Sequence, residues 1–343
     1  MSRRAVIDLG STRPVWSVSA ETIAELRRAF GRGFEVVQVQ APASSDGDGR
    51  SASDEAVTAA RGAEVYVGWG AGAGVIAAAT GTLRWVHTAA AGISAGLARA
   101  LAGSGVVLTN SRGVHAEPMA DWILAALAAC ARGFPAAAHA QADERWAKDV
   151  FTDGSVPVRE LGGMRIGIVG LGGIGRATAL RCAALGMEVR AVRRHAGLRR
   201  PRGVRWVGGR GDLVRLARRS DALVIAAPAT PETERLIDAR VLDALPRGAF
   251  VINVARGSLL DEAALLERLA DGRIGACALD VFATEPLPPG HAFWHHPRVL
   301  LTPHVSAVSP QFWRRESALL TENIRRYRDG RRLRNVVNLE MGY

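Results

Sequence analysis

The chain has 343 residues, of which 48% are hydrophobic and 22% charged. This is the composition of a folded globular protein that is long enough for two domains with separate cores. Its net charge of +11 comes from arginine, since Lys148 is the only lysine. The arginines are scattered without interleaved aromatic residues, so a nucleic-acid partner is not expected. Cys130, Cys182 and Cys277 lie far apart, which argues against a disulfide framework and for a reducing compartment.

The sequence gives no sign of membrane insertion. The first residues run straight into a strand-like segment and contain no signal-peptide core. The most apolar long stretch, Met119–Ala131, is too short to span a bilayer, and charged residues lie in it and beside it. We therefore expect a cytoplasmic protein that does not enter a membrane.

Residues 1–113 alternate short apolar runs with helical patterns, which is typical of a βα repeat that forms its own parallel sheet. Strands are expected at Ala5–Ile7, Glu35–Val39, Val65–Val67, Leu83–Val86 and Val106–Leu108. Helices are expected at Ala20–Phe30, Ser53–Arg61 and Gly74–Ala79, and a surface loop at Ala41–Arg50.

The middle of the chain is predicted to be one long helix, His115–Arg132, followed by a loop with a short helix over Phe134–Arg159. Apolar residues cover most of the circumference of the long helix, so we expect it to be buried between domains or against a partner subunit. A second βα series begins at Met164. Its later strands are expected at Ala222–Ala226, Ala249–Val254, Ile274–Leu279 and Val299–Leu301, and its helices at Leu236–Leu245 and Asp261–Ala270. The last helix, Pro310–Asp329, is expected to return to the first domain.

The strongest motif lies in residues 164–193. A strand rich in β-branched residues runs into glycines with the spacing G-x-G-x-x-G, then a helix that ends at Gly186, then the apolar run Val189–Val192. This strand, turn, helix and strand is the context that dinucleotide binding requires. The pyrophosphate would lie on N–H groups at the positive end of the helix. The residues expected to hold it are Gly170, Gly172, Gly173, Ile174 and Gly175.

The end of the second strand indicates which dinucleotide is bound. An acidic residue there would accept hydrogen bonds from the adenosine ribose. This chain has Arg193 and Arg194 instead, and two guanidinium groups would bind a 2′-phosphate. We therefore favour NADP(H). NAD(H) remains possible, because arginine is abundant throughout the chain.

Three polar residues follow strands of the second series, where open parallel sheets bind their ligands. Arg256 follows the strand Ala249–Val254, Glu285 stands before a proline, and His304 follows the last strand. Each of them alone could be an ordinary surface residue.

Together with their surroundings they resemble the D-isomer-specific 2-hydroxyacid dehydrogenase family, which includes glyoxylate/hydroxypyruvate reductases and phosphoglycerate dehydrogenases. The similarity runs from about Val65 to Ser309 and is carried by His87–Ile93, Gly170–Gly175, Ala227–Thr233, Asn253–Asp261, Ala278–Pro288 and Thr302–Ser306. The resemblance implies an α/β fold of two doubly wound parallel-sheet domains, one a flavodoxin-like substrate domain and the other a Rossmann NAD(P)-binding domain, with a cleft between them. Residues 1–113 and 306–343 would form the first, and residues 114–305 the second.

The resemblance also implies the roles of the three polar residues. His304 would be the general acid that protonates the substrate carbonyl as hydride arrives, and the base in the reverse direction. Glu285 would hydrogen-bond the other imidazole nitrogen, and Arg256 would clamp a 2-oxo acid such as glyoxylate or hydroxypyruvate. The product would be a D-2-hydroxy acid.

The other contacts are likewise implied by the resemblance. The substrate carboxylate would lie on the backbone of Ala90, Ala91 and Gly92, and the pocket wall would include Trp69, His115 and Trp313. The cofactor would contact Ala227, Pro228, Thr233, Val254 and Ala255, and Asp280 would hold the nicotinamide amide. A homodimer that forms through the long helix is also implied.

Two positions depart from the family pattern, Ser94 and Arg193, where the family often has acidic residues. His291, His295 and His296 cluster in the sequence, but they match a metal-free loop of the family and lack nearby acids, so no metal is expected. A cofactor-sensing protein on the same fold, like the corepressors that resemble this family, is the alternative function. No recruitment motif or disordered tail supports it.

Overall fold

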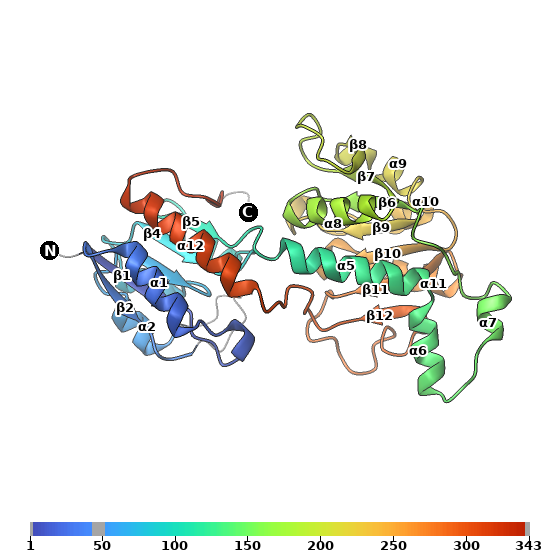
Figure 1. Cartoon of the computed structure of the whole chain (residues 1–343), viewed down its shortest axis with the longest axis horizontal. Helices are drawn as coiled ribbons and strands as arrows, with labels where there is room; N and C mark the ends of the chain where they lie inside the picture. The colour runs from blue at the N-terminus through green and yellow to red at the C-terminus, as the bar shows by residue number, and fades with distance from the viewer. Residues whose placement is uncertain (1–2, 43–51, 340–343) are drawn as a thin grey trace. The chain divides into compact units, whose positions relative to one another are not determined.

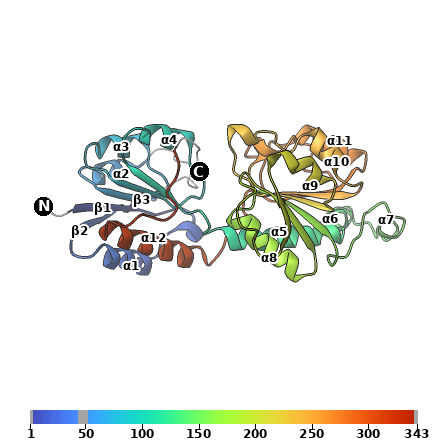
Figure 2. The same ribbon diagram turned by 90° about the horizontal axis from the view of Figure 1, so that it is seen from above.

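The computed structural model describes residues 3–42 and 52–339, and the chain divides into two compact units. The N-terminal unit comprises Met1–His115 and Val308–Tyr343, and the central unit comprises Ala116–Ala307. Each is built on a parallel sheet (Figure 1) with helices on both faces of that sheet, as Figure 2 shows from above. The expected α/β class with two doubly wound sheets is therefore confirmed.

The described part of the N-terminal unit has a five-stranded sheet in the order β2-β1-β3-β4-β5, which is the flavodoxin-like order. Its strands are β1 (Arg3–Asp8), β2 (Phe34–Gln38), β3 (Val65–Gly68), β4 (Trp85–Thr88) and β5 (Val107–Asn110). One face is covered by α1 (Ala20–Phe30) and α12 (Phe312–Arg328), and the other by α2 (Asp54–Ala59), α3 (Ala73–Ala78) and α4 (Ala95–Leu101). A short 3-10 turn, η1 (Pro14–Trp16), precedes α1. Because α12 packs on α1, the last helix does return to the first unit.

In the central unit, the described residues form a seven-stranded sheet in the order β12-β11-β10-β9-β6-β7-β8. Its strands are β6 (Arg165–Val169), β7 (Glu188–Val192), β8 (Val204–Gly208), β9 (Ala222–Ile225), β10 (Ala249–Asn253), β11 (Ile274–Leu279) and β12 (Val299–Leu301). The strand order reverses at β6, between β7 and β9. Open parallel sheets bind dinucleotides at such a reversal.

The helices of the central unit also lie on both faces of its sheet. On one face lie α5 (Ala116–Ala131) and α8 (Gly173–Ala184), and on the other α9 (Leu213–Ala217), α10 (Ala239–Ala244) and α11 (Glu262–Ala270). The segment after α5 forms two helices, α6 (Phe134–Ala142) and α7 (Asp149–Thr152), rather than one. Three 3-10 turns complete the unit: η2 (Arg210–Asp212), η3 (Pro231–Thr233) and η4 (Gly257–Leu259).

Side-chain caps determine where several helices begin. The oxygen atoms of Ser19, Ser53, Ser94, Asp238 and Asp261 each accept a hydrogen bond from the N–H three residues later. Each of these capping residues has an extended backbone, so it lies immediately before the first residue of its helix. This explains why α2 and α11 start one residue after the predicted position and why α10 starts after Asp238.

The packing or the presence of some other elements could not be predicted from the sequence. The helix α5 packs on α8, β10 and β11 of its own unit, and its burial between domains or against a partner subunit stays a prediction. The elements α4, β8 and α9 were not predicted, because they are short and their apolar patterns are weak. The predicted loop Ala41–Arg50 lies mostly outside the described residues.

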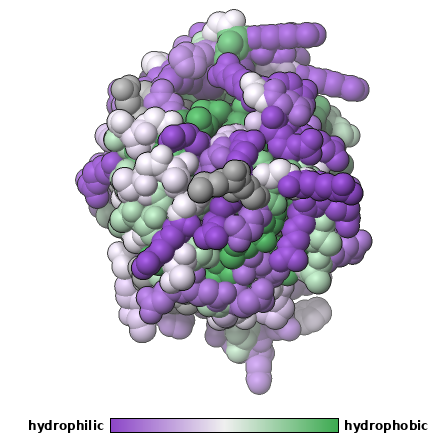
Figure 3. Space-filling model, turned by 90° about the vertical axis from the view of Figure 1, so that its left-hand side faces the viewer, coloured by the Kyte–Doolittle hydropathy of each residue, from purple (hydrophilic) through white to green (hydrophobic). Residues whose placement is uncertain are grey.

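The molecular face in Figure 3 is mostly hydrophilic, with smaller hydrophobic areas between the hydrophilic side chains. Within the described residues, no single helix has the length and apolarity needed to cross a membrane. Only the pair α5 and α6, bent by 71° at their junction, passes that test together.

Candidate active site

Close packing requires glycine at two positions of the loop after β6. At a third position the space beside the glycine is open. Gly170 has a φ of +97°, and a Cβ atom there would lie 2.6 Å from the backbone of Ala226 and Ala227. A Cβ at Gly175 would collide with the carbonyl oxygen of Gly170, whereas one at Gly172 would meet no protein atom within 4 Å. The loop therefore packs tightly against the sheet and leaves room above Gly172.

The first turn of α8 presents its N–H groups at this open place. Among the described residues, no acceptor is recorded for the N–H groups of Gly172, Gly173 and Ile174, as is usual in a first helical turn. Free N–H groups, the positive helix end and the open space above Gly172 fit the pyrophosphate of a dinucleotide. The residues present are thus suited to the nicotinamide cofactor.

The two arginines after β7 turn to different partners. The Nη2 group of Arg193 donates to the carbonyl oxygens of Leu198 and, at 3.2 Å, Arg199. Within the described residues, the buried Nε and Nη1 atoms of Arg193 have no hydrogen-bond partner. Arg194 forms an ion pair of 2.5 Å with Glu232, which lies in η3. Glu232 was not singled out in the sequence, because 38 residues separate it from Arg194 and no local pattern connects them.

The loop after β9 is held by its own hydrogen bonds. The hydroxyl of Thr233 donates to the carbonyl of Pro228 at 2.8 Å and accepts from the N–H of Thr230 at 2.8 Å. The loop, which also contains the half-buried Ala227, is thereby held in a fixed turn beside the glycine loop. Direct contact of these residues with the cofactor stays a prediction.

His304 and Glu285 form the central polar pair of this unit. The Nδ1 atom of His304 lies 2.7 Å from the Oε2 atom of Glu285, and the side chains are 45% and 35% exposed. The other carboxylate oxygen of Glu285 accepts from the N–H of Phe282 at 2.9 Å. The imidazole is therefore fixed through Nδ1, and Nε2 is left for another partner.

The loop that carries His304 is held by the carboxylate of Asp280, which is fully buried. Oδ1 accepts from the Thr302 hydroxyl at 2.6 Å and from the N–H of Val305 at 2.8 Å, and Oδ2 accepts from the N–H of Ser306 at 2.9 Å. His304 itself has a φ of +54°, a conformation that non-glycine residues seldom adopt. These bonds stabilise that backbone, and the implied contact of Asp280 with the nicotinamide amide stays a prediction.

Arg256 lies after β10 and directly precedes the turn η4. A Cβ atom on the next residue, Gly257, would collide with the backbone of Phe282, so only glycine allows this turn to lie against the Glu285 loop. The guanidinium of Arg256 donates to the carbonyl of Ala255 at 2.6 Å and remains accessible to solvent. Crowding by protein atoms lowers its pKa, and the charge of Glu285 partly opposes that shift. Val254 and Ala255, the two residues before it, are buried, and their contact with a cofactor stays a prediction.

A further carboxylate that sequence reasoning missed supports the Glu285 loop. The Oε1 atom of Glu262, at the start of α11, accepts from the N–H of Ala283 at 2.7 Å. Burial raises the pKa of Glu262, and the nearby charge of Glu285 raises it further, although the Ala283 bond and His291 oppose the shift. The acidic first turn of α11 was the available signal, but it resembles an ordinary helix cap.

In the N-terminal unit, the loop after β4 exposes backbone donors. Two of its carbonyl groups are held by hydrogen bonds. The carbonyl oxygen of Ala90 accepts from the N–H of Ser111 at 3.1 Å, and that of Ala91 accepts from the side-chain amide of Asn110 at 2.7 Å. Within the described part of the chain, no acceptor is recorded for the N–H groups of Ala91 and Gly92, and both residues are exposed. A loop with fixed carbonyls and free N–H groups can bind a carboxylate.

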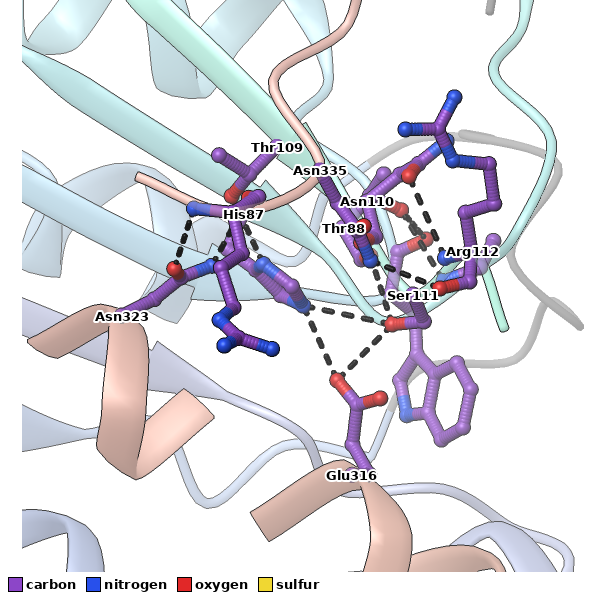
Figure 4. Close-up of polar contacts among 12 residues, drawn as sticks. His87, Thr88, Thr109, Asn110, Ser111, Arg112, Glu316, Asn323 and Asn335 are labelled. Atoms are coloured by element: carbon purple, nitrogen blue, oxygen red, sulfur yellow. Dashed lines mark hydrogen bonds and ion pairs between the residues drawn. The ribbon is translucent and has the colours of Figure 1, made fainter. Parts of the chain in front are cut away.

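A buried polar network lies at the ends of β4 and β5 (Figure 4). His87 and Glu316 are both fully buried, and the imidazole Nε2 lies 3.0 Å from the Oε1 atom of Glu316. Oε1 also accepts from the Ser111 hydroxyl at 2.9 Å, and His87 Nδ1 lies 2.8 Å from the Thr109 hydroxyl. The network thus joins the ends of β4 and β5 to α12. The sequence gives no hint of it, because Glu316 is 229 residues from His87.

The residues expected on the pocket wall belong to an aromatic cluster of the N-terminal unit. Trp69 is buried, and its ring centroid lies 5.9 Å from that of Trp313. Both contact Phe312, on which the ring of His115 stacks at 5.3 Å. Their contact with a substrate stays a prediction.

His291, His295 and His296 all lie in the loop between β11 and β12. Among the described residues, no group of three or more His, Cys, Asp or Glu side chains could hold a metal ion.

Comparison with known proteins places this geometry in a family. The family model for "D-isomer specific 2-hydroxyacid dehydrogenase, NAD binding domain" matches residues 124–306, more than half of the chain. The chain belongs to the D-isomer specific 2-hydroxyacid dehydrogenase family. A family member from Xanthobacter autotrophicus, solved with NADPH and MES, is 31% identical with a TM-score of 0.77, and the match covers 100% of both chains.

Other members of the family are similar over different shares of their length. The NADPH-dependent glyoxylate/hydroxypyruvate reductase of Sinorhizobium meliloti, solved with NADP and sulfate, is 26% identical with a TM-score of 0.75 over 100% of both chains. Glyoxylate/hydroxypyruvate reductase A of Serratia proteamaculans is 37% identical over 179 residues, which are 52% of this chain and 56% of that protein. The chain spans about half the length of several curated relatives it matches, between 43% and 56%. As a member of the family, it has the nicotinamide cofactor domain that the glycine loop predicted.

Proposed function

We propose that this chain is an NAD(P)-dependent oxidoreductase that interconverts a small 2-oxo acid, of the glyoxylate or hydroxypyruvate type, and its D-2-hydroxy acid. The proposal rests on the His304–Glu285 pair at 2.7 Å, held on strand-end loops of the unit that also carries the glycine loop. The relatives are named as reductases and dehydrogenases. That favours an enzyme over a sensing protein on the same fold.

A nicotinamide cofactor held on the glycine loop after β6 would supply the hydride for the carbonyl carbon. His304 holds a proton at Nε2 and passes it to the carbonyl oxygen, while its Nδ1–H group stays bonded to Glu285. The Glu285 carboxylate fixes the ring orientation and stabilises the imidazolium before transfer. In the direction of oxidation, Nε2 accepts the proton of the substrate hydroxyl.

Two further groups are proposed to hold the substrate. The guanidinium of Arg256 has the planar fork that matches the carboxylate and carbonyl oxygens of a 2-oxo acid. The free N–H groups of Ala91 and Gly92, with Ala90 beside them, are proposed to bind the carboxylate. The N-terminal unit would then be the substrate-side domain and the central unit the cofactor domain.

We further propose that NADP(H) is preferred over NAD(H). No acidic residue directly follows β7, and in the part of the chain that the structure describes Arg193 carries buried donor groups without a hydrogen-bond partner. An anionic 2′-phosphate would satisfy such donors. The relatives solved with NADPH and with NADP support the same preference.

A homodimer and a cytoplasmic location are also proposed. The α6–α7 segment exposes large apolar side chains, with Phe134 at 61% and Trp146 at 94%, and exposed apolar groups of this size favour a partner surface. The three cysteines are free and buried, which suits a reducing compartment.

The test follows the absorbance of NADPH, and separately of NADH, with purified protein and a panel of 2-oxo acids. We expect oxidation of NADPH to be the faster, with one small 2-oxo acid preferred. His304→Ala should lower turnover by roughly a hundredfold or more and leave cofactor binding intact, whereas His295→Ala, at an exposed histidine of the same unit, should change neither. Binding of the cofactor without oxidation of NADPH or NADH in the presence of any 2-oxo acid would contradict the proposal that the chain is an enzyme.

A further inference from the structure

A charged cluster lies at the cofactor edge of the central sheet. One carboxylate oxygen of Glu232 lies 2.5 Å from Nη2 of Arg194 and 3.9 Å from Nη1 of Arg210. Arg210 also donates through Nη2 to the backbone carbonyl of Glu232. The three residues come from different segments, after β7, after β8 and after β9.

Backbone hydrogen bonds place these segments at one edge, beside the glycine loop. The N–H of Gly170 donates to Val192, at the end of β7, at 2.9 Å, and the N–H of Ala226, after β9, donates to Val169 at 2.8 Å. The N–H of Arg193 donates to Gly208, at the end of β8, at 3.0 Å. The arginine pair therefore stands where the sheet topology brings the adenosine end of a dinucleotide.

We propose that Glu232 is an internal substitute for the 2′-phosphate of NADP(H), bound by Arg194 and Arg210 in the free protein and displaced when the phosphate arrives. This inference deepens the proposed function, since it rests on dinucleotide binding by the central unit. A phosphate monoester carries more charge than a carboxylate and has three acceptor oxygens, so it competes successfully for two guanidinium groups. NAD(H) has only a hydroxyl at that position and leaves the Glu232 contacts in place. Glu232 thus weakens the binding of NADP(H) alone and limits the discrimination between the two cofactors.

The size of the effect follows from exposure. The side chains of Arg194, Arg210 and Glu232 are 35%, 60% and 56% exposed, and exposed ion pairs are weak and screened by salt. Removal of the Glu232 charge should therefore tighten phosphate binding by about two- to fivefold at low ionic strength. The gain should shrink at high salt.

The experiment measures binding rather than turnover. Isothermal titration gives the Kd of 2′,5′-ADP, 5′-AMP, NADPH and NADH for the wild type, Glu232→Gln and the matched control Glu234→Gln. Glu234 is an exposed glutamate two residues away with no ion pair to Arg194 or Arg210 in the described structure. We expect Glu232→Gln to bind 2′,5′-ADP and NADPH about two- to fivefold more tightly, with 5′-AMP and NADH unchanged, and the control to show no such selective gain. Adding Arg210→Gln to Glu232→Gln should abolish the gain.

Three results would overturn the inference: equal behaviour of the two glutamine variants, weaker binding of 2′,5′-ADP by Glu232→Gln, or equal tightening of 5′-AMP. The proposed cofactor preference is tested separately by the wild type. If the wild type prefers NADH but Glu232→Gln gains affinity for 2′,5′-ADP, the preference is wrong and the role of Glu232 stands. Both glutamine substitutions are at exposed positions, and unchanged melting temperatures would confirm that the variants are folded.

Discussion

Replacement of Asp280 by asparagine tests how the His304 loop is held. The substitution keeps one carbonyl oxygen, which can still accept from the Thr302 hydroxyl and the N–H of Val305. It places an amide NH₂ against the N–H of Ser306, a buried residue that now donates to Oδ2 at 2.9 Å. One charge-assisted hydrogen bond is lost and two donors face each other, which costs about 2–4 kcal/mol.

Thermal unfolding and steady-state kinetics together report the outcome. For a unit of this size each kcal/mol corresponds to roughly 2–4 °C, so we expect the melting temperature of Asp280→Asn to fall by about 5–15 °C. Because the loop positions His304, kcat should fall more than the affinity for NADPH. The control is Asp153→Asn, where an exposed aspartate accepts from the N–H of Ser155 at 2.7 Å, and it should change little. A normal melting temperature with normal kcat would refute the argument, and a loss of cofactor affinity alone would favour the implied contact with the nicotinamide amide.

Three other variants test single features of the fold. Gly175→Ala should cost about 1–3 kcal/mol of stability and weaken NADPH binding, because its methyl group would strike the glycine loop backbone; titration of NADPH measures the loss. Glu316→Ala should lower stability by about 3 kcal/mol, measured by urea unfolding, since it removes the buried carboxylate that pairs with His87 and accepts from the Ser111 hydroxyl. Burial raises the pKa of Asp221, but hydrogen bonds from Arg165 outweigh burial and lower the pKa below its ordinary value of 3.8. The lowered pKa stabilises the folded state at pH values above the ordinary pKa. This stabilisation is lost as the pH falls through the lowered pKa. Urea unfolding should therefore show Asp221→Asn less stable than the wild type from neutral pH to about pH 4, with the difference narrowing in stronger acid.

The sequence was informative where a local pattern carries the structure. Strands such as β6 and β11 are buried on both faces and appear as continuous apolar runs, so their positions could be predicted closely. The edge strand β8 contains Arg205 and the half-buried Trp206, and this mixture resembles a loop. Short helices such as α9 offer too few turns for a periodic pattern.

The candidate site divides along the same line. Arg256, Glu285 and His304 could be named because each follows a strand of a parallel sheet, and such ends lie at one edge. Glu232, Glu262 and Glu316 could not be named in this way. Each is an ordinary glutamate in its local sequence, and each acquires a role only through a partner that the fold brings from elsewhere in the chain.

Two of the carboxylates described above, Asp280 and Glu262, share one physical task. Burial of apolar side chains holds the sheets and helices together, but this force does not fix the orientation of individual groups. The loops at the strand ends have few apolar side chains to bury. Their backbone N–H groups are instead tied to buried or half-buried carboxylates, as Asp280 does for the His304 loop and Glu262 for the Glu285 loop. Hydrogen bonds to a charged acceptor are directional and stronger than those to a neutral acceptor. They therefore hold His304, whose backbone lies in the left-handed region, and its partner Glu285 in one orientation. The precision of the proposed chemistry therefore depends on acidic residues that do not themselves take part in it.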